Sequence, residues 1–396
     1  MTASPTGRTR AQTVLVLCAL ALAPAPALGQ SGDPEFRASI SQTVSAGTNR
    51  GLADPAEDPR FSSNTTLNLG WSRATARDSL SLAGSAGINA SLGDDAEDPV
   101  VPVAPRVALD YARQGTTTRL SLGASLRVDR AEDQDFVLDS ASDPGTGSSG
   151  DLRLTTEEGL QIDGGLSAGL GWDLGPLDSL NASARVSRTE FVDVSTADGS
   201  TDAGASLGWT RTLSPLWRGT LSTGLNQVVS DGENADSIRA SLNGSLNYQE
   251  SDDRSFTAGL GIVVIDAESD DEIVTRFSGN LRGSFELSSR DSLSLGVDQN
   301  VTPGADGALV TRTGASADWT REVTGVDTVI FGLGATRQSV VSGDADDSTL
   351  YRASVTYRRQ ILPGANLTAG YTFRNSTDAA EPSHTVSLGI TLPLFP

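Results

Sequence analysis

The sequence predicts an all-β fold: a transmembrane antiparallel up-and-down β-barrel of about 18 strands, within a range of roughly 16 to 18. Three observations support this class. Aromatic residues recur at a regular spacing, apolar and polar side chains alternate with a period of two, and short and long connections follow the expected strands in turn.

The aromatic spacing matches the length of a β-hairpin. Eight aromatic residues each close an alternating stretch just before a short polar segment, at intervals of 40, 61, 37, 39, 37, 34 and 38 residues. They are Trp71, Tyr111, Trp172, Trp209, Tyr248, Phe285, Trp319 and Tyr357. Two strands of about 10 to 13 residues with their connections occupy roughly 38 residues. A ring of such side chains at one level is an aromatic girdle, because an amphipathic ring is most stable where hydrocarbon meets headgroups.

The alternation gives each expected strand one apolar and one polar face. Over residues 238–249, for example, Leu242 shares a face with apolar neighbours and Arg239 shares the other with Ser and Asn. Residues 79–92 and 275–287 repeat the pattern. Such strands also fit a soluble sandwich. The aromatic ring and the connection lengths favour the barrel.

The N-terminal segment, residues 1–29, has the pattern of a secretory signal peptide. Two arginines precede an apolar run over residues 13–23, and small residues Ala27 and Gly29 take the −3 and −1 positions of a cleavage site. The run is shorter than the roughly 20 residues of a spanning helix. We therefore expect a signal peptide at 1–29 and an outer-membrane barrel over 30–396.

The composition of the mature chain is strongly acidic. The sequence has 29 Lys and Arg residues, all arginine, and 50 Asp and Glu; removing Arg8 and Arg10 leaves 27 arginines, hence a net charge of 27 − 50 = −23. The acidity argues against a nucleic-acid partner, which requires a clustered positive patch. Cys18, the one cysteine, falls in the signal peptide, so no disulfide is expected. Only 37% of residues are hydrophobic, which leaves disorder as an alternative that the regular alternation disfavours.

Connections of two kinds follow one another along the chain, after a first strand at about residues 36–48. Tight polar links come directly after the aromatics: ATARDS, RQGTT, DLGPLDS, TLSPL, ESDDR, SSRDS, EVTGVD and ILPG. Longer acid-rich connections lie near residues 49–60, 93–103, 130–158, 193–202, 230–237, 266–272, 302–307, 341–348 and 377–383. Short turns at one rim and longer loops at the other are typical of bacterial outer-membrane barrels, with the short turns periplasmic and both termini on that side.

In this architecture the mature chain resembles the outer-membrane β-barrel proteins of Gram-negative bacteria, the porins in particular. Its last strand, HTVSLGITLPLFP, is similar to the C-terminal assembly signal of that family. The alternating residues are Val386, Leu388, Ile390, Leu392 and Leu394, and Phe395 stands close to the end, out of phase with them and followed by Pro396. The resemblance implies a location in the outer membrane, contact with outer-membrane lipid and lipopolysaccharide, and insertion by the barrel-assembly machinery.

Catalytic, cofactor-binding and metal-binding residues are not expected. His384 is the single candidate base, and no motif fixes a nucleophile beside it, so a rim residue is the favoured interpretation and the protein is not expected to be an enzyme. Acidic segments at 231–237, 268–272 and 343–348 lack the spacing of an EF-hand loop. Solvated loop tips are favoured for them, with weak divalent-cation binding as the alternative.

One long connection, at residues 130–158, explains the 61-residue interval. It follows the fifth strand, the position of the loop that narrows the pore in the porins that the chain resembles. Its acids are Glu132, Asp133, Asp135, Asp139 and Asp143, and the arginines on the predicted inward phase of the strands are Arg119, Arg127, Arg239, Arg276, Arg282 and Arg352. Acids facing arginines would set a transverse field across a constriction. A disordered external loop, favoured by GTGSSG, is the alternative.

The function that the sequence favours is passive diffusion of small hydrophilic solutes through an outer-membrane pore, with a preference for cations suggested by the acidity. Sixteen to eighteen strands leave an aqueous channel, and small inward side chains do not fill it. A conduit for an exported polymer such as an exopolysaccharide, and a structural or surface anchor barrel, are the alternatives. Neither the solute nor the oligomeric state follows from the sequence.

Overall fold

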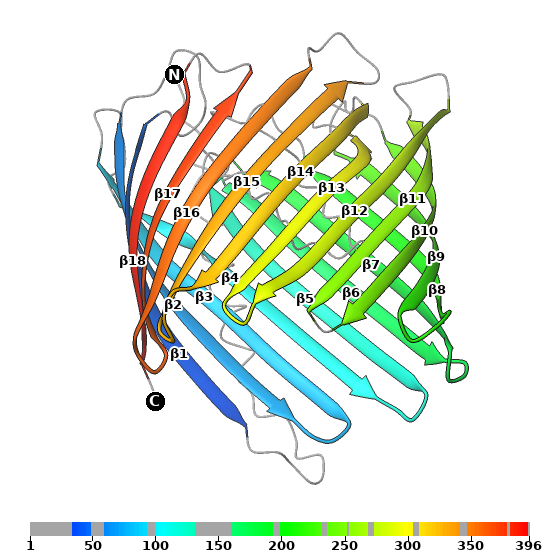
Figure 1. Cartoon of the computed structure of the whole chain (residues 1–396). Coiled ribbons are helices and arrows are strands. Elements are labelled where there is room, and N and C mark those ends of the chain that lie inside the picture. The colour runs from blue at the N-terminus through cyan, green and yellow to red at the C-terminus, as the bar shows by residue number, and fades with distance from the viewer. Residues whose placement is uncertain are drawn as a thin grey trace, which may run out of the picture.

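The structure is a computed structural model and describes residues 34–48, 59–92, 100–130, 160–192, 199–231, 236–251, 253–267, 273–303, 309–340, 347–377 and 381–394. Eighteen antiparallel strands form one sheet that closes on itself as a barrel (Figure 1). The expected signal peptide and Phe395 lie outside the described residues. Within the described residues, no helix is long and apolar enough to cross a membrane.

The strands follow one another around the barrel in chain order. They are β1 (Glu35–Thr48), β2 (Arg60–Ala74), β3 (Asp78–Leu92), β4 (Val100–Gln114), β5 (Thr118–Arg130), β6 (Leu160–Asp173), β7 (Asp178–Val192), β8 (Ser200–Thr212), β9 (Trp217–Ser230), β10 (Ser237–Ser251), β11 (Arg254–Ala267), β12 (Val274–Ser288), β13 (Asp291–Pro303), β14 (Leu309–Glu322), β15 (Asp327–Val340), β16 (Ser348–Leu362), β17 (Ala365–Ser376) and β18 (Ser383–Pro393). The predicted class, an up-and-down barrel of 18 strands, is confirmed.

Closure of the barrel is made by the first and last strands. β1 pairs with β18 from Ser39 opposite Pro393 to Thr48 opposite His384, and on its other side with β2. No edge strand is therefore left, and every strand has two hydrogen-bonded neighbours. A closed ladder is the condition for strands to span lipid, because each unpaired backbone group there costs several kcal/mol.

The outward faces of the strands are apolar and open. Leu260 is 80% exposed and Phe277 is 74% exposed, and Leu242 and Leu281 are also exposed on the same surface. The interior is not a hydrophobic core: among the described residues, the buried apolar cluster consists of Ile265 and Val301, with Val263 and Val274 packed against it. This inversion of the usual arrangement is what a barrel surrounded by hydrocarbon requires.

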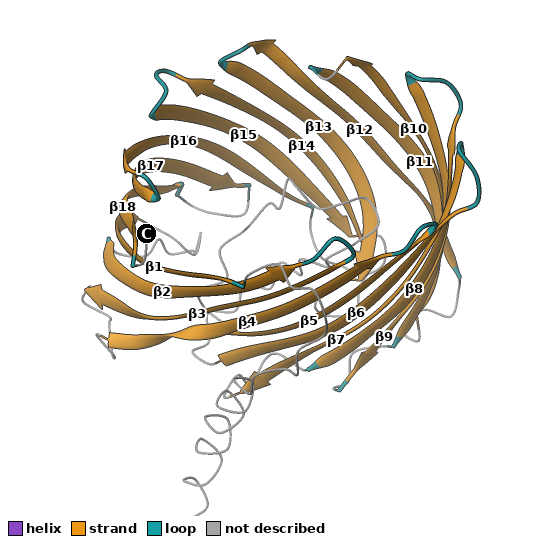
Figure 2. Ribbon diagram, turned by 90° about the horizontal axis from the view of Figure 1, so that it is seen from below, coloured by secondary structure: helices purple, strands orange, loops and turns teal. Residues whose placement is uncertain are grey.

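The two rims differ in their connections. At the rim of the short turns, Glu35 of β1 pairs with Ser72 of β2, and Pro393 of β18 pairs with Ser39, so the first strand begins and the last strand ends there. Figure 2 shows the barrel from below, with β1 and β18 side by side. Hydroxyl groups close several of these turns; the Oγ1 of Thr75, for instance, accepts from the backbone N–H of Asp78 at 2.9 Å.

Gly364 lies in one of the two-residue turns of this rim. It lies between β16 and β17 with a φ of +79°, the left-handed region, and a Cβ on it would stand 3.2 Å from the Cγ of Pro393. Both the backbone conformation and the neighbouring strand end therefore require a residue without a side chain.

We expect Gly364→Ala to lower the free energy of unfolding by about 1 kcal/mol or more, because a left-handed conformation costs a residue with a Cβ roughly that amount. The measurement is urea-induced unfolding of the folded protein in lipid vesicles. Gly325→Ala is the matched control, since a Cβ on that turn glycine meets no atom within 4 Å. Equal effects of the two substitutions would show that the left-handed conformation of Gly364 does not contribute to stability.

Candidate functional site

The candidate site is the inner wall of the barrel. Successive side chains of a strand point to opposite faces, so each exposed outer leucine fixes the phase of its strand. In β10, Leu242 and Leu246 are exposed on the outer face, and Arg239, Asn243 and Asn247 therefore lie on the inner wall. The same parity, carried from strand to strand by the register, gives a polar wall around the barrel.

The register places four arginines in one row across the wall. Ten residues on β9 to β18 stand directly opposite one another in succession: Arg218, Asn247, Thr257, Arg282, Gly296, Ser316, Gly334, Arg352, Arg374 and Ser383. We call Arg218, Arg282, Arg352 and Arg374 the arginine row. It begins beside a short turn, at the second residue of β9, and ends beside the first residue of β18 at the opposite rim, so it crosses the whole height of the wall.

Two arginines of the row are direct neighbours on adjacent strands. Arg352 and Arg374 are directly opposite on β16 and β17, where Cβ atoms are about 4.5 to 5.5 Å apart and equal charges repel. Arg374 is buried, and the buried Nε of Arg352 has no hydrogen-bond partner among the described residues. Gly296 and Gly334 stand directly opposite Arg282 and Arg352 and place no side chain beside them. An anion bound between Arg352 and Arg374 would interact with two guanidinium groups.

A second charged cluster surrounds Asp202 on β8. Its carboxylate is 3.6 Å from the Nε of Arg185 on β7 and 3.7 Å from an Nη of Arg239 on β10, and it accepts a 2.9 Å hydrogen bond from the amide of Asn226 on β9. The Asp202 and Arg239 side chains are each 13% exposed. Gly204 makes the approach possible, because a Cβ there would lie 2.7 Å from the Oδ1 of Asn226. One carboxylate thus faces two guanidinium groups.

A third group lies on β4 to β6. Arg106 is directly opposite Arg127, and Arg127 is directly opposite Asp163. The carboxylate of Asp163 also accepts from the hydroxyl of Thr189 at 2.8 Å and from the amide of Gln161 at 2.9 Å. In this group two arginines therefore stand beside one acid.

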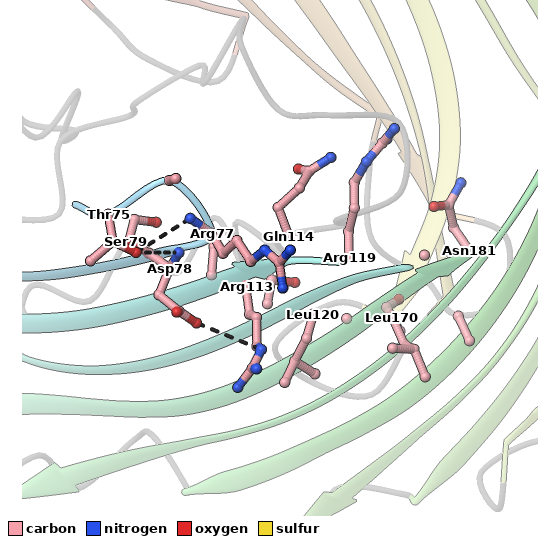
Figure 3. A pocket seen from close by; sticks show the side chains of 17 residues that line it. Thr75, Arg77, Asp78, Ser79, Arg113, Gln114, Arg119, Leu120, Leu170 and Asn181 are labelled. Atoms are coloured by element: carbon pink, nitrogen blue, oxygen red, sulfur yellow. Dashed lines mark hydrogen bonds and ion pairs between the residues drawn. The ribbon is translucent and has the colours of Figure 1, made fainter. Parts of the chain in front are cut away.

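A hollow of about 530 Å³ lies against the wall between β3 and β7, near the short-turn rim. Figure 3 shows the side chains of Gln114, Arg119 and Asn181 on the inner side of the strands, with Leu120 and Leu170 on the outer side. Arg119 stands opposite Gln114 and is 3.3 Å from Asp173 at the end of β6. On the inner side, the hollow therefore offers the guanidinium of Arg119 and the amides of Gln114 and Asn181 to a solute; its lining also includes Arg77 and Arg113.

The predicted site residues take the following places. Arg119, Arg127, Arg239, Arg276, Arg282 and Arg352 are all on the inner wall by register. Glu132, Asp133, Asp135, Asp139 and Asp143 lie outside the described residues. His384 is on the outer face of β18, where its Nδ1 is 2.9 Å from the hydroxyl of Tyr371.

The eight predicted girdle aromatics lie on the outer face close to the short-turn rim, each within a few residues of the end of its strand. Trp71 and Tyr111, for example, are in phase with the exposed Leu69 and Leu109. Neighbouring rings touch along the rim: the Tyr248 ring is 4.7 Å from that of Trp217, and Trp319 stacks on Phe331 at 5.2 Å.

The inner wall carries several charges in addition to the predicted arginines. Arg374, Arg218 and Arg185 have the same phase as the polar residues of their strands, so the alternation alone could have placed them on the wall. Asp202 is the last residue of the acid-rich connection expected at 193–202, whereas the structure places it within β8. Which of these charges meet depends on the register between strands, which the alternation within one strand does not contain.

The closed 18-strand barrel, with a polar inner wall and an apolar outer face, is the fold of a porin-like outer-membrane channel, and the expected location in the outer membrane of a Gram-negative bacterium agrees with it. Solved structures share this fold. Pseudomonas aeruginosa OpdL matches with a TM-score of 0.52 and 12% identity over 92% of this chain and 99% of its own. P. aeruginosa OpdQ matches with 0.51 and 9%, covering 92% and 100%, and Acinetobacter baumannii OccAB4 with 0.50 and 10%, covering 92% and 98%.

No protein-family model matches the sequence. No curated protein matches it either. These three structures are 9 to 12% identical to this chain, so the fold is what it has in common with them.

The assignment of the two faces is open to a direct test. In Asn243→Cys the thiol points into the lumen, and in Leu242→Cys, one residue away, it points to lipid. We expect a charged, membrane-impermeant thiol reagent to label the first variant rapidly in vesicles and the second only after solubilisation, because the reagent does not enter hydrocarbon. Labelling of Leu242→Cys from the aqueous phase would show that Leu242 faces the lumen and Asn243 faces lipid.

Proposed function

We propose that the protein is an outer-membrane pore for passive diffusion of small hydrophilic solutes, and that it has no catalytic role. Eighteen strands enclose an aqueous channel when the inward side chains are small. Between the arginines, the row across β9 to β18 carries glycine, serine, threonine and asparagine. These side chains hydrogen-bond to solutes without filling the interior.

The single observation that carries the solute preference is the arginine row. A solute with an anionic group meets Arg374 and Arg352 near one rim, Arg282 further along and Arg218 near the other rim. Repeated weak contacts suit conduction, because each must be favourable enough to enter and weak enough to leave. We therefore propose that small anionic solutes are the preferred class.

The charge balance of the wall supports this preference. Among inner-wall residues whose side chains the structure describes, the arginines are Arg37, Arg106, Arg119, Arg127, Arg185, Arg218, Arg239, Arg276, Arg282, Arg312, Arg352, Arg358 and Arg374. The acids are Glu35, Asp110, Asp163, Asp173, Asp202, Glu286, Asp298, Asp318 and Glu322. The arginines outnumber the acids there.

The cation preference expected from the sequence is the alternative. It depends on the net charge of −23, whose carboxylates are concentrated in the long connections, many of them outside the described residues. Acids at the mouth concentrate cations within a Debye length of about 10 Å at 0.1 M salt. The test is the reversal potential across a salt gradient in a planar bilayer. Anion selectivity would support control by the arginines of the inner wall, and cation selectivity would support control by the acids at the mouth.

Removing two members of the arginine row tests the proposed solute preference. Arg282→Gln combined with Arg352→Gln should lower the anion-to-cation permeability ratio by up to about fivefold per arginine, since a unit charge 4 Å away is worth about 1 kcal/mol in water. The matched control is Arg188→Gln combined with Arg337→Gln, which removes the same charge from the outer face. An equal drop in the control would show that net charge alone acts.

The connection at residues 130–158 is the other part of the proposed pore. We propose that this connection enters the lumen and narrows the pore through Glu132, Asp133, Asp135, Asp139 and Asp143. Deleting residues 133–149 should then raise the single-channel conductance and change the selectivity. Unchanged conductance would make it an external loop, and the absence of any pore in the intact protein would favour the polymer-conduit or anchor function.

A further inference from the structure

The outer face of the short-turn rim carries a repeated charged group. In the first instance, Asp78 opens β3, and Tyr111 and Arg113 of β4 stand beside it, Arg113 directly opposite. The same arrangement recurs with Asp178, Trp209 and Arg211, with Asp291, Trp319 and Arg321, and with Asp327, Tyr357 and Arg359. We call these four groups the rim triads.

In seven cases a strand that follows a short turn is paired with a next strand that carries a girdle aromatic; the acid and the arginine are both present in four of these and both absent in three. Arg73, two residues after Trp71, is an arginine at the same position that stands opposite Leu80. The acid is the first residue after a short turn, and the arginine comes two residues after the next girdle aromatic. Where the strand after a turn opens with Thr118, Trp217 or Arg254, the corresponding arginine position is occupied by Leu174, Glu250 and Leu287 respectively. An arginine that served only to contact the membrane would not need the acid.

In three of the four triads the acid accepts a hydrogen bond from the aromatic member. The carboxylate of Asp78 accepts from the hydroxyl of Tyr111 at 2.8 Å, that of Asp178 from the indole N–H of Trp209 at 3.1 Å, and that of Asp327 from the hydroxyl of Tyr357 at 2.5 Å. In the remaining triad the acid, Asp291, accepts from Ser288 at 2.7 Å.

The ion pairs themselves are open. The guanidinium-to-carboxylate distances are 3.7, 3.7, 3.6 and 3.7 Å for Arg113, Arg211, Arg321 and Arg359. These distances exceed that of a hydrogen bond, and each contact uses one nitrogen of a group with five N–H donors. The arginine side chains are 61, 49, 55 and 55% exposed. Figure 3 shows Asp78 and Arg113 on the opposite side of the wall from Arg119.

The triads stand at headgroup depth. An arginine two residues beyond the girdle aromatic is roughly 7 Å further along the strand, outside the hydrocarbon that the aromatic ring borders. The charge pattern at this depth is one fixed cation beside one fixed anion. An anionic headgroup matches only the arginine and is repelled by the acid, whereas a zwitterionic headgroup matches both.

We propose that each rim triad binds one phospholipid with a phosphate and a primary ammonium in its headgroup, the phosphate on the arginine and the ammonium on the aspartate. The paired charges explain why the acid accompanies the arginine, and the half-exposed guanidinium explains how the phosphate reaches it. The site is on the outer face and is independent of the solute that the lumen passes.

The test is native mass spectrometry of the folded protein with phosphatidylethanolamine, phosphatidylcholine or phosphatidylglycerol of identical acyl chains. We expect up to four tightly held phosphatidylethanolamines and fewer of the other two lipids, because a quaternary ammonium donates no hydrogen bond and a glycerol headgroup has no cation. Replacing Arg113, Arg211, Arg321 and Arg359 together by Gln should abolish the tight binding. Equal retention of the three lipids by the natural sequence would overturn the proposal.

Two further variants keep the outcome interpretable. Arg188→Gln with Arg337→Gln removes outer-face arginines that are ion-paired at 2.7 Å near the other rim, and should leave phosphatidylethanolamine binding unchanged. Where the fourfold variant does not fold, as judged by its electrophoretic mobility before and after heating, Arg113→Gln alone should lose one bound lipid. Asp78→Asn should lose the preference for phosphatidylethanolamine over phosphatidylglycerol at one site. Unchanged phosphatidylethanolamine binding in both single variants would show that the triads do not bind lipid and serve only as ion pairs between adjacent strands.

Discussion

The closed ladder of backbone hydrogen bonds is the constraint on which the rest of this structure depends. In hydrocarbon no water satisfies a free N–H or C=O group, so eighteen strands must pair all the way round, from β1 to β18. Because pairing fixes the phase of each strand against its neighbours, it also decides which side chains face lipid and which face the lumen. The polar inner wall is a consequence of closure and not a separate feature.

The strands and their phase could be predicted because both are local. Leu242 and Arg239 alternate within a few residues, and the girdle aromatics recur at hairpin length, so neither depends on a distant segment. The arginine row could not be predicted. Arg352 meets Arg374 only through the offset between β16 and β17, and Asp202 meets Arg239 across β9. A shift of one residue between two strands would have brought different side chains together.

The long connections are the second feature whose arrangement could not be predicted from the sequence. The segment at 130–158 has no apolar period that would tie it to the wall, and its acids can be solvated outside the barrel or paired with arginines inside it. The two arrangements differ in long-range electrostatics, which a sequence does not record. The short turns are the opposite case: Gly364 and the hydroxyl of Thr75 are required by backbone geometry within a few residues.

Arginine has a different role on each face, and the surroundings explain the difference. On the inner wall Arg352 and Arg374 stand opposite each other, and Asp202 is shared by Arg185 and Arg239, since water and permeating ions screen a surplus of charge. On the outer face Arg113, Arg188 and Arg337 each have an aspartate beside them. An unpaired charge moving toward hydrocarbon costs roughly 2 to 4 kcal/mol at the midplane, falling toward the interface. Arginines in excess of acids can therefore contribute to selectivity only in the lumen. At the outer rim, where each of these arginines has an aspartate beside it, a ligand must carry both a negative and a positive charge.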